Sequence, residues 1–237
     1  MKDEVLEICP RCKRALKMRF HRDYLEEPWT VSCICDCMDE DRTDEFQPAP
    51  IGESFHNIIR DQRFKEAVFE KDDLKTPKVT THCKEYVIHF KQNLKNRKNG
   101  LVLFGETGVG KSFFAACVGN ALLDYGFTVL ATTLPRLSAD VKFGELNEQL
   151  HKLKQYQALI IDDWGIERKT EYMDEFMQTI VDERYRQGLP IILTTNRNRD
   201  QIIYPADAAE RRILSRLAEM ADFVPVKGED RRIKGNL

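Results

Sequence analysis

The chain has 237 residues, of which 32% are charged, and its formal net charge is −2. This length allows one large domain, or a large and a small one, with a core that needs no disulfide bonds. The small net charge excludes any argument from overall charge to nucleic acid binding. The N-terminus lacks the apolar region of a signal peptide, and no apolar run approaches the ~20 residues of a membrane span. We therefore expect a cytoplasmic protein without a membrane partner.

The first forty residues contain five of the seven cysteines. Cys9 and Cys12 form a C-x-x-C pair, and a second group of cysteines follows about twenty residues later. In a reducing compartment, two thiolate groups at this spacing are typical of a tetrahedral zinc site to which each group donates two sulfur atoms. We therefore predict a Zn²⁺ site, and the metal would supply most of the folding energy of so small a unit.

The sequence leaves the second pair of zinc ligands open. Residues 29–32 are predicted to form a strand, and its period of two places Cys33, Cys35 and Cys37 on one face. We favour Cys35 and Cys37, with Cys33 as the main alternative. His21 is a further candidate ligand, although a lone histidine is more often a surface residue.

An acidic and then proline-flanked stretch, residues 38–50, is typical of a hydrated linker. We expect a domain boundary here. The predicted organisation is a zinc-binding, partner-binding domain over residues 1–45, a linker with N-terminal helices over 46–99 and the main domain over 100–237.

Apolar spacing predicts short helices within residues 53–69 and a longer amphipathic helix over 81–94. Residues 75–98 carry seven Lys or Arg and a single acid, Glu85. This basic face is either an ordinary solvated helix surface or a contact surface for phosphates.

Residues 105–112 fit the phosphate-binding pattern G-x-x-x-x-G-K-[ST] at every fixed position. The apolar run 101–104 is predicted to be a strand and residues 112–125 a helix, which is the context that the pattern requires. Glycines permit positive φ angles, so successive N–H groups can turn toward a phosphate. We predict a nucleotide site formed by the loop and the first residues of its helix: Gly105, Glu106, Thr107, Gly108, Val109, Gly110, Lys111, Ser112 and Phe113.

Two residues of this loop have distinct predicted roles. The Lys111 ammonium would reach the β- and γ-phosphates of ATP. The Ser112 hydroxyl would complete the coordination of a Mg²⁺ ion that keeps most of its waters.

A second strand is predicted over residues 127–132, followed by a helix over 134–156 that breaks near Gly144. The next apolar strand, from residue 158, ends in Asp162 and Asp163. Because the ends of parallel strands meet beside the phosphate loop, Asp162 can hold Mg²⁺ through water and Asp163 can orient the attacking water.

A capped helix is predicted over residues 170–187 and a buried strand over 189–195. Asn196 follows that strand. If the strand lies between the phosphate-loop strand and the Asp-Asp strand, the Asn196 amide can bond the γ-phosphate or the attacking water. The alternative is an asparagine that only forms a turn.

Four motifs in this order carry a resemblance: the phosphate loop, I-I-D-D-W-G at 160–165, T-T-N at 194–196 and E-R-R-I-L-S-R-L at 210–217. Over residues 50–237 the chain resembles the DnaC/DnaI helicase-loader family of AAA+ ATPases, with the transposition helper IstB as a near relative. The cysteine-rich front resembles the zinc-bearing domains of some loaders, especially phage-borne ones. The resemblance implies an α/β fold, an αβα core with the phosphate-loop strand at its centre.

The resemblance also implies roles for individual residues. Lys111 and Ser112 correspond to Walker A, Asp162 and Asp163 to Walker B, and Asn196 to sensor 1. The family's second Walker B acid is often Glu, so the Asp-Asp pair leaves the rate of hydrolysis open.

Two arginine positions near the C-terminus complete the implied site. Arg216 matches the arginine finger that reaches a neighbouring subunit, which implies a homo-oligomer in the ATP state. The alternative is that Arg211, Arg212 and Arg216 form an ordinary basic helix face paired with Glu210 and Glu219. Sensor 2 falls on Arg232 or Arg231, of which we favour Arg232.

The function implied is an ATP-controlled loader that binds a replicative helicase and single-stranded DNA, uses ATP turnover, and grips the helicase through its N-terminal domain. The alternatives are an IstB-like transposition helper, a nucleotide-gated binding module with negligible turnover, and a small-molecule kinase. Cationic and aromatic residues of the 134–156 insertion are the candidate DNA contacts: Lys142, Phe143, His151, Lys152, Lys154 and Tyr156.

Overall fold

The computed structural model describes residues 4–8, 15–20, 29–32, 65–73, 75–95, 98–142, 150, 152–166 and 170–232. The chain divides into two compact units, Met1–Gln47 and Pro48–Leu237.

The N-terminal unit contains a three-stranded antiparallel sheet in the order β1 (Glu4–Ile8), β2 (Ala15–Phe20) and β3 (Trp29–Ser32). The predicted strand at 29–32 is confirmed. Sequence analysis missed β2, although its sequence A-L-K-M-R-F alternates apolar and charged residues as a strand does. All five N-terminal cysteines and His21 lie outside the described residues, so the zinc site stays a prediction.

The larger unit is built on a five-stranded parallel sheet in the order β5–β6–β7–β4–β8. Parallel strands that are covered on both faces are expected to be continuously apolar, and every residue of β7 is buried. The strands are β4 (Gly100–Phe104), β5 (Val129–Thr133), β6 (Ala158–Trp164), β7 (Ile191–Thr195) and β8 (Ala221–Pro225).

The strand order corrects one expectation and confirms another. The phosphate-loop strand β4 is not central, because β8 is the single strand beyond it and three strands lie on its other side. The central strand is β7. It pairs with both β4 and β6, as the Asn196 argument required.

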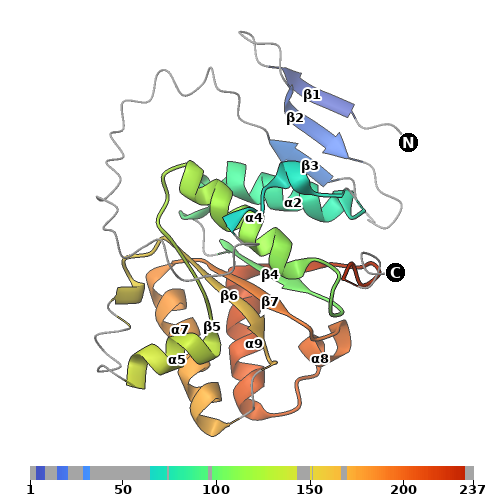
Figure 1. Cartoon of the computed structure of the whole chain (residues 1–237). Coiled ribbons are helices and arrows are strands. Elements are labelled where there is room, and N and C mark those ends of the chain that lie inside the picture. Colours follow the sequence, from blue (N-terminus) through green and yellow to red (C-terminus); the bar gives the residue numbers. More distant parts are fainter. Residues whose placement is uncertain are drawn as a thin grey trace. The chain divides into compact units, whose positions relative to one another are not determined.

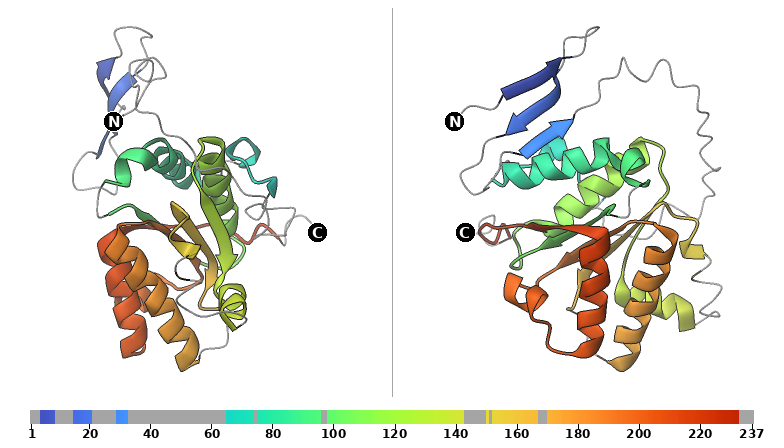
Figure 2. Two further views of the ribbon diagram at one scale, coloured as in Figure 1. Left: turned by 90° about the vertical axis from the view of Figure 1, so that its left-hand side faces the viewer. Right: turned by 180° about the vertical axis from the view of Figure 1, so that it is seen from behind.

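Helices cover both faces of this sheet and give three layers (Figures 1 and 2). One face carries α2 (Pro77–Ile88) and α4 (Lys111–Asp124), with α3 (Phe90–Asn93) following α2. The other carries α5 (Leu134–Lys142), α7 (Glu171–Gln187) and α9 (Ala208–Met220). The described part of this unit also contains two short elements: η3 (Phe69–Lys71) and α8 (Arg199–Ile203).

The helix ends follow local chemistry. α7 begins after Thr170, whose hydroxyl accepts a hydrogen bond from Met173 N, and it ends at Gly188 in the left-handed conformation. The helix predicted over 81–94 was placed too late. α2 begins at Pro77, where proline suits the first helical turn, and the helix breaks at His89.

In the part of the chain that the structure describes, no helix has both the length and the apolar character needed to cross a membrane.

Candidate nucleotide-binding site

The phosphate loop connects the end of β4 to the start of α4 at Lys111. Its three glycines have positive φ: 145° at Gly105, 80° at Gly108 and 103° at Gly110. Space also requires glycine at position 105, because a Cβ there would lie 2.2 Å from the backbone atom Val226 O. The sequence therefore gives the loop a backbone that turns its N–H groups inward.

The first turn of α4 suits an anion. Gly110 caps this helix without a side-chain hydrogen bond, and the first turn contains no acidic residue. The N–H groups at a helix start lack intrahelical partners and carry partial positive charge. They therefore offer donors to a phosphate group.

Lys111 lies across the loop and is 4% exposed. Its Nζ donates a hydrogen bond to Glu106 O at 2.6 Å. Burial lowers the pKa of Lys111, and the negative charges of Asp163 and Asp162 oppose that shift. A bound phosphate would add to this stabilisation of the ammonium.

Asp162 ends the apolar part of β6 and is 8% exposed. The Thr194 hydroxyl donates to Asp162 Oδ1 at 2.6 Å, and the Ser112 side chain is also hydrogen-bonded to this carboxylate. Burial raises the pKa of Asp162, while the bond from Thr194 opposes that shift. A buried carboxylate beside a hydroxyl group is an oxygen donor set that fits Mg²⁺, whose charge would favour the ionised carboxylate.

Asp163 has a left-handed backbone, with φ 58°. The pairing of β6 with β7 is irregular between Ile161 and Trp164, so Asp163 leaves the ladder here. Its N–H donates instead to Thr194 Oγ1 at 2.7 Å. One threonine hydroxyl therefore fixes both Asp162 and Asp163.

Thr194 is a site residue that sequence analysis did not single out. It is 0% exposed, in a strand whose neighbouring residues are mostly aliphatic. A hydroxyl at a fully buried strand position needs a partner, which was the available signal. Asn196 lies two residues further on, at the edge where β4 and β6 also end.

The C-terminal segment lies against the phosphate loop. Arg231 N donates to Gly108 O at 3.0 Å. The Arg231 guanidinium lies 3.1 Å from Asp73 Oδ1 and donates to Thr76 Oγ1 at 3.0 Å. Arg231 thus ties the segment that precedes α2 to the loop.

Arg232 has a different environment. Its side chain is exposed, and its backbone N–H donates to Asp230 Oδ1 at 2.9 Å. Burial is the main cause of the lowered pKa of Lys111, and the positive charge of Arg232 contributes to it. Of the two arginines, Arg232 is the one whose charge acts on Lys111.

A cavity of about 220 Å³ adjoins the loop on the side of Arg231. Its position beside the loop makes it the candidate place for the sugar and base of a nucleotide whose phosphates occupy the loop. Its lining comes from the segment before α2 and from the C-terminal segment: Lys75, Thr76, Gly228, Glu229, Asp230 and Arg231.

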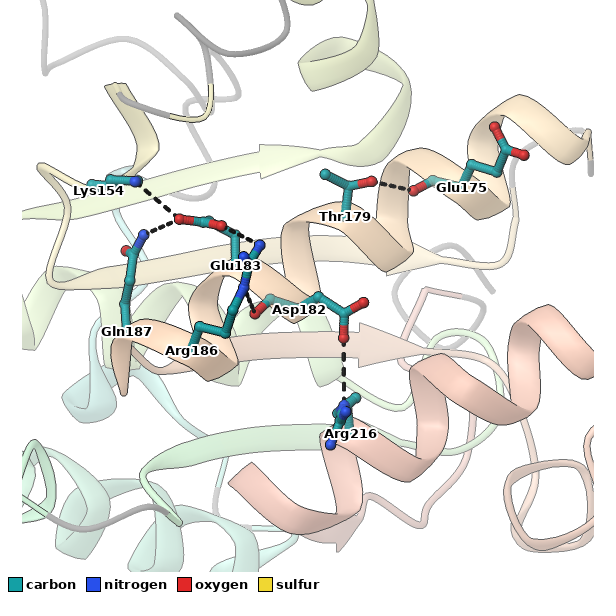
Figure 3. A network of polar contacts seen from close by, with 8 residues as sticks. All are labelled: Lys154, Glu175, Thr179, Asp182, Glu183, Arg186, Gln187 and Arg216. Atoms are coloured by element: carbon teal, nitrogen blue, oxygen red, sulfur yellow. Dashed lines mark hydrogen bonds and ion pairs between the residues drawn. The ribbon is translucent and has the colours of Figure 1, made fainter.

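Arg216 lies far along α9, and its side chain meets Asp182 of α7 (Figure 3). Helix α9 leads from the strand ends beside the loop to the start of β8, and Arg216 is eight residues along it, a rise of about 12 Å. Its guanidinium lies 3.4 Å from Asp182 Oδ1 and 3.7 Å from Glu219 Oε2, and stacks 4.6 Å from the Tyr185 ring centre. The expected partner Glu219 is therefore present.

Glu210, the other acid expected to pair with this basic face, has a different partner. It forms an ion pair with Arg197 at the start of α9.

The candidate DNA contacts stay a prediction, and the structure describes the side chains of three of them. Lys152 is exposed, but Lys154 Nζ lies 2.9 Å from Glu183 Oε1, and Tyr156 packs against the core (Figure 3 shows the Lys154 contact). Tyr156 is only half-buried, so its stacking role stays a prediction. Phe143, His151 and the side chain of Lys142 lie outside the described residues.

The basic face of residues 75–98 is partly neutralised at its ends. Lys75 lies 3.2 Å from Asp73, and Lys98 lies 2.9 Å from Asp222. These two cations therefore belong to surface ion pairs.

A family model described as IstB-like ATP binding protein matches residues 85–237. The replicative helicase loader DnaI of Bacillus subtilis (strain 168) is 26% identical over 183 residues, which cover 70% of this chain and 58% of DnaI. The phage-like element PBSX protein XkdC of the same organism is 27% identical over 228 residues, covering 93% of this chain and 82% of XkdC.

Solved structures show the same fold. A crystal structure of DnaI has a TM-score of 0.60 at 22% identity, covering 72% of this chain and 96% of that one. A crystal structure of the DnaC helicase loader has a TM-score of 0.60 at 23% identity, covering 70% and 100%. The fold built on the five-stranded parallel sheet is thus the fold of these two structures. Because the family match spans more than half of the sequence, this chain belongs to the family of IstB-like ATP binding proteins.

Proposed function

We propose that this protein is an ATP-dependent helicase loader in DNA replication. The observation that carries the proposal is the convergence of the phosphate loop, Asp162, Asp163 and Asn196 at one edge of a parallel sheet. The similarity to DnaI and DnaC, both named replicative helicase loaders, supports the biological role.

The site residues divide the work of phosphoryl transfer. Loop N–H groups and Lys111 hold the phosphates of ATP. Ser112 and Asp162 hold Mg²⁺, which neutralises charge on the phosphates. Asp163 orients the attacking water, and Asn196 contacts the γ-phosphate or that water.

Arg232 serves as sensor 2, since Arg231 is occupied by Asp73 and Thr76. An exposed arginine beside the loop can approach the phosphates without giving up a buried contact.

Arg216 acts on the phosphates of a neighbouring subunit. The rise along α9 keeps it from its own loop, so hydrolysis requires a homo-oligomer. Arg216→Ala should spare ATP binding and lower turnover on the order of 10³-fold. Mixing it with Lys111→Ala protein should restore part of the turnover, because each variant supplies what the other lacks. No recovery at any mixing ratio would contradict a finger supplied in trans.

The N-terminal unit binds the helicase and is organised by Zn²⁺ on Cys9, Cys12, Cys35 and Cys37, with Cys33 as the alternative fourth ligand. Single-stranded DNA is held by the 134–156 insertion, through Lys142 and Lys152.

An IstB-like transposition helper is the second candidate, because the matching family model carries that description. The two functions differ in partner. We would purify the tagged chain from its native cell with ATP present, and then test the partner as a purified protein on single-stranded DNA circles.

A loader should co-purify with the replicative helicase and increase the amount of helicase on DNA, and Lys111→Ala should abolish that increase. Co-purification with a transposase, and no effect on helicase, would replace the proposal with the second candidate.

A further inference from the structure

Arg197 directly follows Asn196, just after β7 ends, and its side chain lies against the end of the neighbouring strand β6. Its guanidinium stacks 4.2 Å from the centre of the Trp164 ring. It also packs against the backbone of Gly165, where an added Cβ would lie 1.9 Å from the Arg197 Nη1 atom. Trp164 follows Asp163, so this side chain touches the strand end that carries the Asp-Asp pair.

The ends of β6 and β7 are also joined by hydrogen bonds. Thr195 Oγ1 donates to Trp164 O at 2.8 Å, and Arg197 N donates to Thr195 Oγ1 at 3.3 Å. A movement of either strand end is therefore transmitted to the other and to Arg197.

The Arg197 guanidinium also binds a side chain of helix α9. Both Nε and Nη2 contact Glu210 Oε1, and the side chains are only 18% and 7% exposed. Glu210 sits in the first turn of α9, where its N–H donates to the Asp207 carboxylate that caps the helix. The same helix carries Arg216, six residues further along.

We propose that Arg197 and Glu210 form a positioning pair that couples the strand ends at Asp163 and Asn196 to helix α9. The inference rests on the proposed ATPase function. When nucleotide engages Asn196 or Asp163, the pair conveys the change to the helix that presents Arg216 to the next subunit. Neither residue touches the reacting atoms.

The decisive variants separate positioning from simple support of the fold. Arg197→Lys keeps the positive charge but loses the planar group that contacts Glu210 and Trp164 together. The double variant Arg197→Gln with Glu210→Gln removes both charges, so no unpaired charge remains buried. Arg211→Gln, an exposed arginine next to Glu210 in sequence, is the matched control.

The measurements are thermal unfolding, affinity for a fluorescent ATP analogue, and kcat. We expect Arg197→Lys and the double variant to bind the analogue within about twofold of wild type and to lose roughly tenfold or more in kcat, because small misplacements of catalytic groups are costly. Arg211→Gln should match wild type in all three. A double variant that is as stable as wild type and has the wild-type kcat would overturn the proposal.

A second readout does not need hydrolysis. In a Trp29→Phe background, Trp164 is the remaining tryptophan, and its emission should change when the analogue binds. Arg197→Lys should bind with that change lost or much reduced. An unaltered emission change in Arg197→Lys would also overturn the proposal. Failure of the wild-type chain to bind the analogue at all would instead refute the ATP-binding function on which it rests.

Discussion

Replacing Thr194 with valine tests the geometry of the candidate site most directly. The hydroxyl of this fully buried residue donates to Asp162 Oδ1 at 2.6 Å and accepts from Asp163 N at 2.7 Å. Valine has nearly the same shape, so the substitution opens no cavity and removes only these two bonds.

The expected loss of stability follows from the groups left behind. The Asp163 N–H loses its acceptor, and Asp162 loses one donor while keeping its bond to Ser112. A buried polar group without its partner costs about 1–3 kcal/mol, so the variant should lose about 2–4 kcal/mol of unfolding free energy. Urea unfolding at constant m value would measure this loss.

The loss should depend on pH. Burial already raises the pKa of Asp162, and removing the Thr194 bond raises it further. A carboxyl with a raised folded-state pKa destabilises the fold as pH rises through the unfolded and then the folded pKa. The difference between variant and wild type should therefore shrink toward acidic pH.

Thr132→Val is the matched control, because Thr132 is 2% exposed in the same sheet and its hydroxyl donates only to Thr133 O at 3.3 Å. It should lose less than about 1 kcal/mol. Equal losses in the two variants would refute the dual role of the Thr194 hydroxyl. In the ATPase assay Thr194→Val should lower kcat far more than ATP affinity, since Asp163 loses its anchor.

Three further predictions concern other parts of the chain. The N-terminal unit should contain close to one Zn²⁺ per chain, and Cys9→Ser should lose metal and fold together; elemental analysis showing no zinc in protein purified without chelator would refute the site. Burial raises the pKa of Glu85 from 4.5 to about 7, so its ionisation destabilises the fold as pH rises through that range. Glu85→Gln should therefore raise the melting temperature at about pH 8 and have little effect at about pH 5; an equal effect at both would contradict the shift. Replacing Lys142 and Lys152 with alanine should weaken single-stranded DNA binding and lower its salt slope by ~0.7 for each lost phosphate contact. Lys154→Ala, which breaks an ion pair with Glu183, should change the slope less; an unchanged slope in the double replacement would place the DNA elsewhere.

The parts of the fold that sequence predicted well are those where one local pattern has one outcome. Mainly apolar runs predicted β4, β6 and β7, and a capped helical pattern beginning at Thr170 predicted α7. Strand order was less accessible. The central position of β7 depends on which edge of the growing sheet each strand joins, and no local sequence pattern determines that choice.

The site shows the same division. The phosphate loop could be identified from spacing because the positive φ angles at its three glycines favour that residue, and at Gly105 space excludes any other. The ion-pair partners of the arginines could not be identified from the sequence, because most of these partners are far away along the chain. Glu210, expected to pair with the basic face of its own helix, pairs with Arg197, and Arg231 reaches Asp73 more than 150 residues earlier.

The contacts of Arg216 bear on how an assembly would use it. Its ion pair with Asp182 is between side chains that are 44% and 37% exposed, and such pairs contribute only about 0–1 kcal/mol. An arginine finger that accelerates hydrolysis on the order of 10³-fold lowers the barrier by about 4 kcal/mol. Transfer of the guanidinium from Asp182 to a neighbour's γ-phosphate is therefore favourable in the transition state. The contact with α7 then holds Arg216 in an isolated subunit without preventing its use in an oligomer, so turnover should rise with protein concentration as subunits associate.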